Sequence, residues 1–159
     1  MKLAQGLAEK RDVDPAIFSV ADLLDSAFAA AHAGAFDLLL DKGTYDAISL
    51  SGDPAHRRRF IETAAAIAKP GTGRFLITSC NWTQDELVAH FEPGRRRCTN
   101  QRCRTAHRIG TDRSRSRVHR ASDAAFAYHS HVKQPTFTFG GKQGQTTVTV
   151  AFQRTAANV

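Results

Sequence analysis

Polar side chains that could hold a ligand follow two short apolar runs, at the point where each run stops. Asp41 comes directly after the run at residues 36–40, and the sequence Ser-Cys-Asn-Trp at residues 79–82 follows the run at residues 75–77. In open parallel sheets, ligands bind beyond the carboxyl ends of the strands. If both runs are strands of such a sheet, these side chains share one ligand-binding edge.

The segment between the two runs has the pattern of a helix. Asp53 followed by Pro54 is a good helix start, because the carboxylate can accept a free N–H and proline lacks one. The apolar stripe that follows comprises Phe60, Ile61, Ala64, Ile67 and Ala68. Lys69-Pro70-Gly71 then ends the helix, and a strand is expected at Arg74–Thr78. Strand, loop, helix and strand form the unit of a parallel sheet, so the fold class is predicted to be α/β.

Further elements are expected on both sides of this unit. Residues 1–11 place small and apolar side chains on one helical face. The segment Ile17–Ala21 has the composition of a buried strand that ends at Asp22. Thr83 and Glu86 have the spacing of a capping box and predict the start of another helix.

The end of the chain has the pattern of an antiparallel hairpin. Residues 146–152 alternate as a strand, and residues 134–141 form a second extended segment. Residues 142–144 lie between them and are predicted to form the turn.

The bulk composition fits one folded domain. A length of 159 residues with 42% hydrophobic residues is enough for a real core. No apolar run approaches the roughly 20 residues that span a bilayer, and the N-terminus lacks a signal-peptide core. Three cysteines, an odd number, fit a reducing compartment better than a disulfide framework. We therefore expect a cytoplasmic protein that does not associate with a membrane.

The net charge of +7 belongs to one segment of the chain. Residues 95–120 hold ten arginines and one acid, whereas the remainder has 12 basic and 14 acidic residues. This basic segment contains no aromatic residue on which a base could stack. Nucleic-acid binding is therefore not the expected function.

Residues 95–130 show no sustained helical or alternating period, and we expect an irregular, arginine-rich insert that is disordered. The spacing of its potential zinc ligands differs from that of familiar zinc fingers, and no core pattern surrounds them. These ligands are Cys98, Cys103, His107 and His119. We expect no metal.

Three blocks of sequence resemble a known family, and they occur in the family's order. They are Asp-Lys-Gly-Thr-Tyr-Asp-Ala-Ile-Ser-Leu at 41–50, Phe-Leu-Ile-Thr-Ser-Cys-Asn-Trp-Thr at 75–83, and Phe-Thr-Phe-Gly-Gly at 137–141. In these blocks the chain is similar to the elongation factor 1-alpha lysine methyltransferases, which are seven-β-strand, S-adenosylmethionine-dependent enzymes. The resemblance extends over residues 1–92 and 132–154.

The resemblance implies a partial Rossmann-like class I methyltransferase sheet that lacks its first two strands and ends in an antiparallel hairpin. The family's glycine-rich cofactor loop should precede residue 1, and no Gly-x-Gly occurs before Asp41. On this basis residues 1–94 are the C-terminal part of the methyltransferase core, residues 95–130 are the insert, and residues 131–154 are the terminal hairpin. We therefore expect an N-terminally truncated copy of the enzyme.

The implied reaction is transfer of a methyl group from S-adenosylmethionine to a lysine of translation elongation factor 1-alpha. Ala21, Asp22 and Leu23 take the place where the family contacts the adenine ring. Asp41 lies next to the methyl donor, where a carboxylate could orient the incoming ammonium and help its proton leave. An acid at the end of a strand that caps a helix is an equally good explanation of Asp22.

The resemblance also implies residues that contact the substrate. Lys42, Tyr45, Asn81, Trp82 and Phe139 are these candidates. Tyr45 and Trp82 could line a channel for the lysine stem, with cation–π attraction to its charged end. Each candidate has a simpler alternative, namely a solvated loop for Lys42, core packing for the aromatic residues, and loop stabilisation for Asn81.

A second functional interpretation is a non-catalytic remnant or binding module for the same elongation factor. The missing strands would lie between the segment at Ile17–Ala21 and the run at residues 36–40. Their absence would leave two apolar strand edges unpaired, which favours aggregation. An active enzyme must bind S-adenosylmethionine, whereas a remnant need not.

Overall fold

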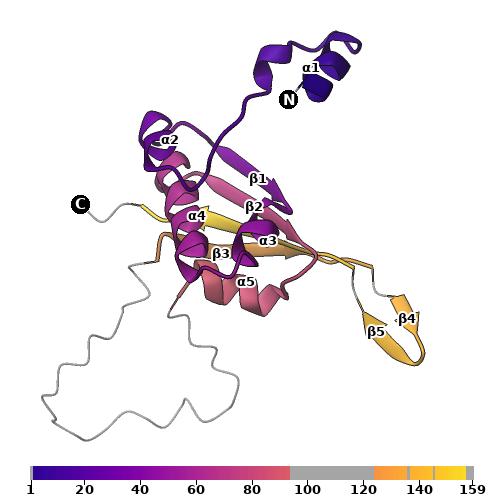
Figure 1. Cartoon of the computed structure of the whole chain (residues 1–159). Helices are drawn as coiled ribbons and strands as arrows, with labels where there is room; N and C mark the ends of the chain where they lie inside the picture. The colour runs from indigo at the N-terminus through magenta and orange to yellow at the C-terminus, as the bar shows by residue number, and fades with distance from the viewer. Residues whose placement is uncertain (1, 94–123, 136, 145, 157–159) are drawn as a thin grey trace, which may run out of the picture.

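The computed structural model describes residues 2–93, 124–135, 137–144 and 146–156, and every structural statement below refers to these ranges. Its centre is a four-stranded sheet with the order β1-β2-β6-β3. The strands are β1 (Leu38–Lys42), β2 (Arg74–Ser79), β3 (Phe126–Val132) and β6 (Val148–Arg154). β1 and β2 are parallel, whereas β6 is antiparallel to both of its neighbours, β2 and β3. The fold is therefore mixed α/β, as expected (Figure 1).

Helices cover one face of this sheet. They are α3 (Thr44–Ser49), α4 (Pro54–Ile67) and α5 (Gln84–Phe91), and α2 (Ser26–Ala31) lies beside α4. Helix α1 (Lys2–Glu9) packs on the 3-10 helix η1 (Pro15–Ile17) and stands away from the sheet (Figure 1).

The two helix starts predicted from the sequence are confirmed. The Asp53 carboxylate accepts a hydrogen bond from the Ala55 N–H, and Pro54 is the first residue of α4. At α5 both halves of the capping box form between Thr83 and Glu86.

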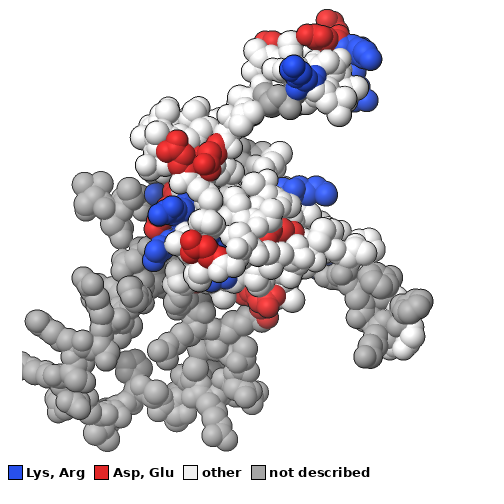
Figure 2. Space-filling model, in the orientation of Figure 1, with Lys and Arg blue, Asp and Glu red and all other residues white. Residues whose placement is uncertain are grey.

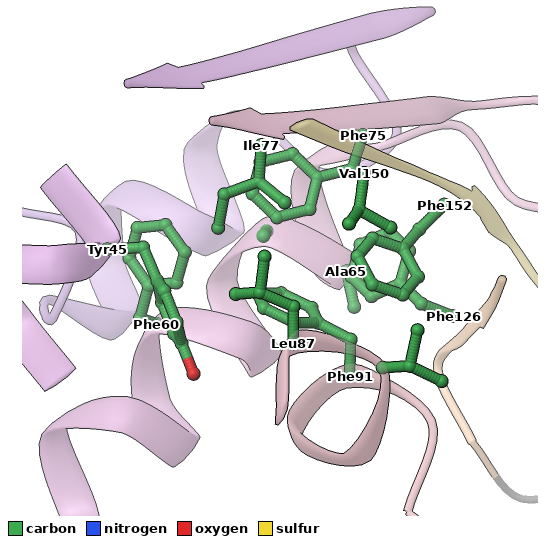
Figure 3. Packing of buried hydrophobic residues seen from close by; sticks show 12 residues of the cluster. Tyr45, Phe60, Ala65, Phe75, Ile77, Leu87, Phe91, Phe126, Val150 and Phe152 are labelled. Atoms are coloured by element: carbon green, nitrogen blue, oxygen red, sulfur yellow. The ribbon is translucent and has the colours of Figure 1, made fainter. Parts of the chain in front are cut away.

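Phe91 lies at the centre of the core. Its ring is fully buried and lies 5.1 Å from Tyr45, 5.3 Å from Phe75 and 5.0 Å from Phe152, between ring centroids. These partners come from α3, β2 and β6, so one side chain of α5 joins a neighbouring helix to two strands of the sheet (Figure 3). Aromatic pairs at such separations are favourable beyond the apolar area that they bury.

Among the described residues, none covers the opposite face of β1. Leu38 and Leu40 are 53% and 70% exposed, and Leu39 between them packs against the core. Within the described ranges, β1 has a strand partner only on the β2 side. In the part of the chain that the structure describes, the outer edge of β1 is therefore open.

The predicted strand at Ile17–Ala21 was wrong. Residues 15–17 form η1, and residues 18–22 continue as a linker without a strand partner. Asp14 accepts a hydrogen bond from the Ala16 N–H, and Pro15 is the first residue of the helical turn. Asp53 and Pro54 cap α4 in the same way. An apolar run becomes a strand only where another strand supplies hydrogen bonds, and none does so here.

The terminal hairpin was wrong in its pairing. β6 pairs with β3, which begins at Phe126 and so lies partly inside the range expected to be irregular. The predicted turn at residues 142–144 is instead strand β5 (Lys142–Gly144), which pairs with β4 (Phe137–Phe139) in a separate small hairpin. Gly140 and Gly141, with φ of 57° and 76°, make the tight turn of that hairpin.

Replacement of Phe91 by alanine should lower the free energy of unfolding by about 3–5 kcal/mol, because it opens a cavity between the helices and the sheet. Urea unfolding followed by circular dichroism would measure this loss. Phe18→Ala is the matched control, since Phe18 is 38% exposed and lies in the linker. Equal losses in the two variants would contradict a core centred on Phe91.

Candidate functional site

Four strand ends meet at one edge of the sheet. Lys42 of β1 pairs with Thr78 of β2, and Ser79 of β2 pairs with Val148 of β6. The last residue of β3, Val132, is also paired with this end of β6. Asp41, near the end of β1, and the Ser79–Trp82 segment, at the end of β2, therefore lie at the same edge of two neighbouring parallel strands.

An open cleft of about 660 Å³ lies at this edge, and we call it the polar cleft. One wall is formed by residues 79–84, which connect β2 to α5. Residues 131–134 and 146–148 form the rest of the lining. The residues that line the cleft include none with a carboxylate, so its polarity comes from hydroxyl, amide, imidazole and lysine side chains.

A second concave region of about 290 Å³ is lined mainly by β1 and α4, and we call it the β1 groove. Most of its lining is apolar, with Asp41, Thr44 and Thr63 as its polar side chains. Leu23 also lines it, so the linker before α2 and the end of β1 meet there. The size lies near the lower limit for small-molecule pockets.

Asp41 is half-buried at the end of the β1 groove. Both of its carboxylate oxygens lie 3.3 Å from the Tyr45 N–H, at the start of α3. Burial raises the pKa of Asp41, and hydrogen bonds from Tyr45 and Thr44 oppose that rise. The carboxyl group is therefore a stronger proton acceptor, when ionised, than an ordinary surface aspartate.

Tyr45 and His90 form a polar pair at the margin of the core. Tyr45 is fully buried, and its hydroxyl lies 2.7 Å from the His90 Nδ1. The Arg57 guanidinium lies 3.1 Å from the His90 Nε2. Because arginine can only donate, Nε2 accepts this bond, and the neutral ring carries its proton on Nδ1. The Nδ1–H therefore donates to the Tyr45 oxygen.

A buried carboxylate that the sequence analysis did not single out lies behind the polar cleft. Asp46 is 6% exposed and accepts hydrogen bonds from the Ser79 hydroxyl and the Cys80 N–H. The sequence offered a weak signal, because Asp46 lies in the same block as Asp41. Its partners follow by 33 and 34 residues, and no local pattern connects them.

The structure separates the three residues expected at the adenine ring. Ala21 and Asp22 are exposed, and the Asp22 carboxylate accepts a hydrogen bond from the Leu24 N–H. This bond lies within a local turn, and the residue that caps α2 is Asp25, not Asp22 as the alternative expected. Leu23 is partly buried and lies with Asp41 in the β1 groove.

The substrate candidates also fall into different places. Asn81 and Trp82 line the polar cleft, whereas Lys42 is exposed and lines neither concave region. Tyr45 is fully buried in the core, where the alternative of core packing puts it. Phe139 lies in β4, and its side chain falls outside what the structure describes.

The described residues hold no cluster of three or more metal-ligating side chains, and no helix among them is long and apolar enough to cross a membrane. The Cys98–His119 set and the whole arginine-rich run lie outside the described residues.

On the face shown in Figure 2, basic and acidic side chains of the described residues are interspersed.

His90 should make stability depend on pH. Burial lowers the pKa of His90, the Arg57 charge lowers it further, and Glu86 opposes both effects. The unfolded chain therefore binds more protons than the folded chain just below the ordinary histidine pKa of about 6.5. Stability should fall as the pH drops through that value, down to the lower pKa of the folded state.

Urea unfolding of the wild type and His90→Gln at pH 7.5 and pH 5.5 would measure this effect. The glutamine variant stays neutral, so it should lose less stability than the wild type on acidification. An equal loss in the two proteins would show that His90 does not titrate with a lowered pKa.

Comparison with known proteins gives relatives but no matching family model. Protein-lysine N-methyltransferase EFM4 of Saccharomyces cerevisiae is 35% identical over 96% of this chain and 54% of its own length. Protein-lysine N-methyltransferase efm4 of Schizosaccharomyces pombe is 33% identical over 95% of this chain and 52% of its own length. EEF1A lysine methyltransferase 2 of Homo sapiens is 28% identical over 97% and 51%.

A solved structure supports the fold alone. It comes from a study titled "Conversion of a Disulfide Bond into a Thioacetal Group during Echinomycin Biosynthesis". The TM-score is 0.52 and the identity 14%, over 99% of this chain and 63% of that chain.

The chain described here spans about half the length of the curated relatives that it matches. The predicted resemblance is confirmed: over nearly its whole length this chain is similar to proteins named EEF1A lysine methyltransferase 2 and protein-lysine N-methyltransferase EFM4.

Proposed function

We propose that this chain carries part of an S-adenosylmethionine-dependent protein-lysine N-methyltransferase that acts on translation elongation factor 1-alpha. Its similarity to three proteins named as lysine methyltransferases carries the proposal. The arrangement of the sheet supports it, because Asp41 and Trp82 follow neighbouring strands at the edge where open α/β sheets bind ligands. The cytoplasm, where translation takes place, is the location that fits this substrate.

In this proposal the described sheet is part of a Rossmann-like class I methyltransferase sheet, without the first two strands of that sheet. Parallel sheets normally have both faces covered and both edges of an inner strand paired. β1 meets neither condition, since Leu38 and Leu40 are exposed and its outer edge is open. Further strands of the complete sheet would pair with that edge, which places the β1 groove in the interior.

The described residues fit one end of S-adenosylmethionine. Leu23 and the apolar side chains of the β1 groove suit a flat adenine ring, and the Asp41 carboxylate suits a positive charge. The described ranges hold no glycine-rich turn for the charged amino-acid end. Leu23 and Asp41 would therefore hold the adenosyl end, with Ala21 and Asp22 beside it on the linker. When bound, the cofactor supplies an electrophilic methyl group on its sulfonium.

The residues at the edge would position and deprotonate the substrate amine. Asp41 orients the lysine ammonium and accepts a proton or passes it to water, a task that suits its raised pKa. Trp82 offers an aromatic face to the cation, and Asn81 offers an amide to the substrate backbone. Alignment and exclusion of water would supply most of the rate enhancement.

Asp41→Asn should lower methyl transfer at least about 100-fold, because an amide cannot accept the proton. The chain would be incubated with elongation factor 1-alpha and S-adenosylmethionine, and lysine methylation followed by mass spectrometry. Asp37→Asn is the control, since Asp37 lies next to β1 in an exposed ion pair with Lys69. Equal activity of Asp41→Asn and the wild type would contradict the role of Asp41.

The alternative is a non-catalytic binding module for the same elongation factor. Calorimetric titration with S-adenosylmethionine separates the two functions. Saturable binding together with methyl transfer supports the enzyme. If the chain neither binds S-adenosylmethionine nor transfers a methyl group, but still binds elongation factor 1-alpha in a pull-down, the result would contradict the enzyme and support the binding module.

A further inference from the structure

The buried Asp46 carboxylate holds the wall of the polar cleft from behind. Asp46 lies in the first turn of α3, yet its oxygens do not cap that helix. One oxygen accepts a hydrogen bond from the Ser79 hydroxyl at 2.5 Å, and the other accepts one from the Cys80 N–H at 3.0 Å. Bonds to a carboxylate are stronger than those between neutral groups, and burial makes their loss costly.

Ser79 passes this constraint on to the next residues. Its side chain is buried, and its oxygen accepts hydrogen bonds from the N–H groups of Asn81 and Trp82 at 3.1 and 3.0 Å. A hydroxyl has one proton and two acceptor positions. Both acceptor positions are filled by these amides, and the single proton is donated to Asp46. Every N–H from Cys80 to Trp82 is therefore bonded to the Asp46–Ser79 pair.

A second connection joins Asp46 to the Trp82 side chain. The Trp82 Nε1–H donates to the Ser49 hydroxyl at 2.8 Å, and that hydroxyl donates to the Asp46 carbonyl oxygen at 3.1 Å. The indole also contacts the His90 ring edge-on, at 4.8 Å between centroids. Backbone and side chain of Trp82 are thus both tied to α3.

We propose that Asp46 is a positioning residue, which fixes the Cys80–Trp82 turn in the conformation that forms the substrate-binding wall of the polar cleft. Asp46 does not line the cleft: its carboxylate acts through Ser79 and Cys80, and its backbone carbonyl acts through Ser49. The link to substrate rests on the proposed methyltransferase function. The link to the turn does not, because it rests on the hydrogen bonds alone.

Asp46→Asn tests the positioning directly. An asparagine has one acceptor oxygen, so the turn loses either the Cys80 bond or one of the Ser79 bonds, whichever way the amide faces. Amide hydrogen exchange at residues 80–82 should accelerate about tenfold, the effect of one lost bond to a carboxylate. Trp82 is the only tryptophan of the chain, so its fluorescence should shift to longer wavelength as the indole becomes hydrated.

Exchange in β2 distinguishes positioning from general stabilisation. Asp46→Asn should accelerate residues 80–82 well beyond residues 75–77, whereas a purely structural loss would accelerate both segments together. Cys80→Ala is the matched control, since it keeps the backbone N–H that Asp46 binds. No acceleration at residues 80–82, equal acceleration in β2, or the same effect from Cys80→Ala would overturn the proposal.

Ser49→Ala provides a second variant if Asp46→Asn does not fold. It removes the partner of the Trp82 indole and leaves the Asp46 carboxylate in place. The expected result is a shift of Trp82 fluorescence to longer wavelength with unchanged exchange at Cys80. Unchanged fluorescence would show that α3 does not hold the indole, and would overturn the proposal.

Kinetics with elongation factor 1-alpha test the link to substrate. Asp46→Asn should raise KM for the protein substrate about tenfold and leave the cofactor Kd unchanged. A changed exchange rate with unchanged KM would overturn the role in substrate binding. If the wild type transfers no methyl group, the methyltransferase function fails, while the exchange and fluorescence results still decide whether Asp46 holds the turn.

Discussion

The packing of Phe91 against the sheet is the interaction on which the rest of the structure depends. The ring touches aromatic side chains of β2, β3 and β6, and it also touches Tyr45 of α3. It thereby fixes α5, and α5 fixes the two groups at the margin of the core, His90 and the turn that ends at Thr83. Loss of this apolar contact would release the polar groups along with the helix.

Hydrogen bonds from buried polar groups fix the orientation of the segments that the apolar core packs together. Apolar packing is non-directional and tolerates small shifts. A buried carboxylate without hydrogen-bond donors, by contrast, would strongly destabilise the fold. Asp46 and Ser79 meet this demand by binding three successive N–H groups of one turn. The cleft wall is therefore specified by hydrogen bonds, although the energy that keeps it on the sheet comes from the rings behind it.

Local signals could be predicted from the sequence, and non-local ones could not. Asp53-Pro54 and the capping box at Thr83 work within four residues, and both were found where expected. The strand expected at Ile17–Ala21 needed a distant partner that composition does not reveal. The partner of β6 was missed for the same reason, and so was the bond between Asp46 and Ser79. The position of Asp41 and Trp82 at one edge of the sheet could be predicted, because each comes at the end of a short apolar run.

The exposed face of β1 ties the fold to the proposed chemistry. Leu38 and Leu40 alternate with Leu39, so one face of the strand is in the core and the other is in water. That pattern is typical of a parallel strand that is buried on both faces, and it is costly at an open edge. The same strand lines the β1 groove, where Asp41 is half-buried. A group that covered β1 would remove more water from Asp41 and would raise the pKa of its carboxyl group further.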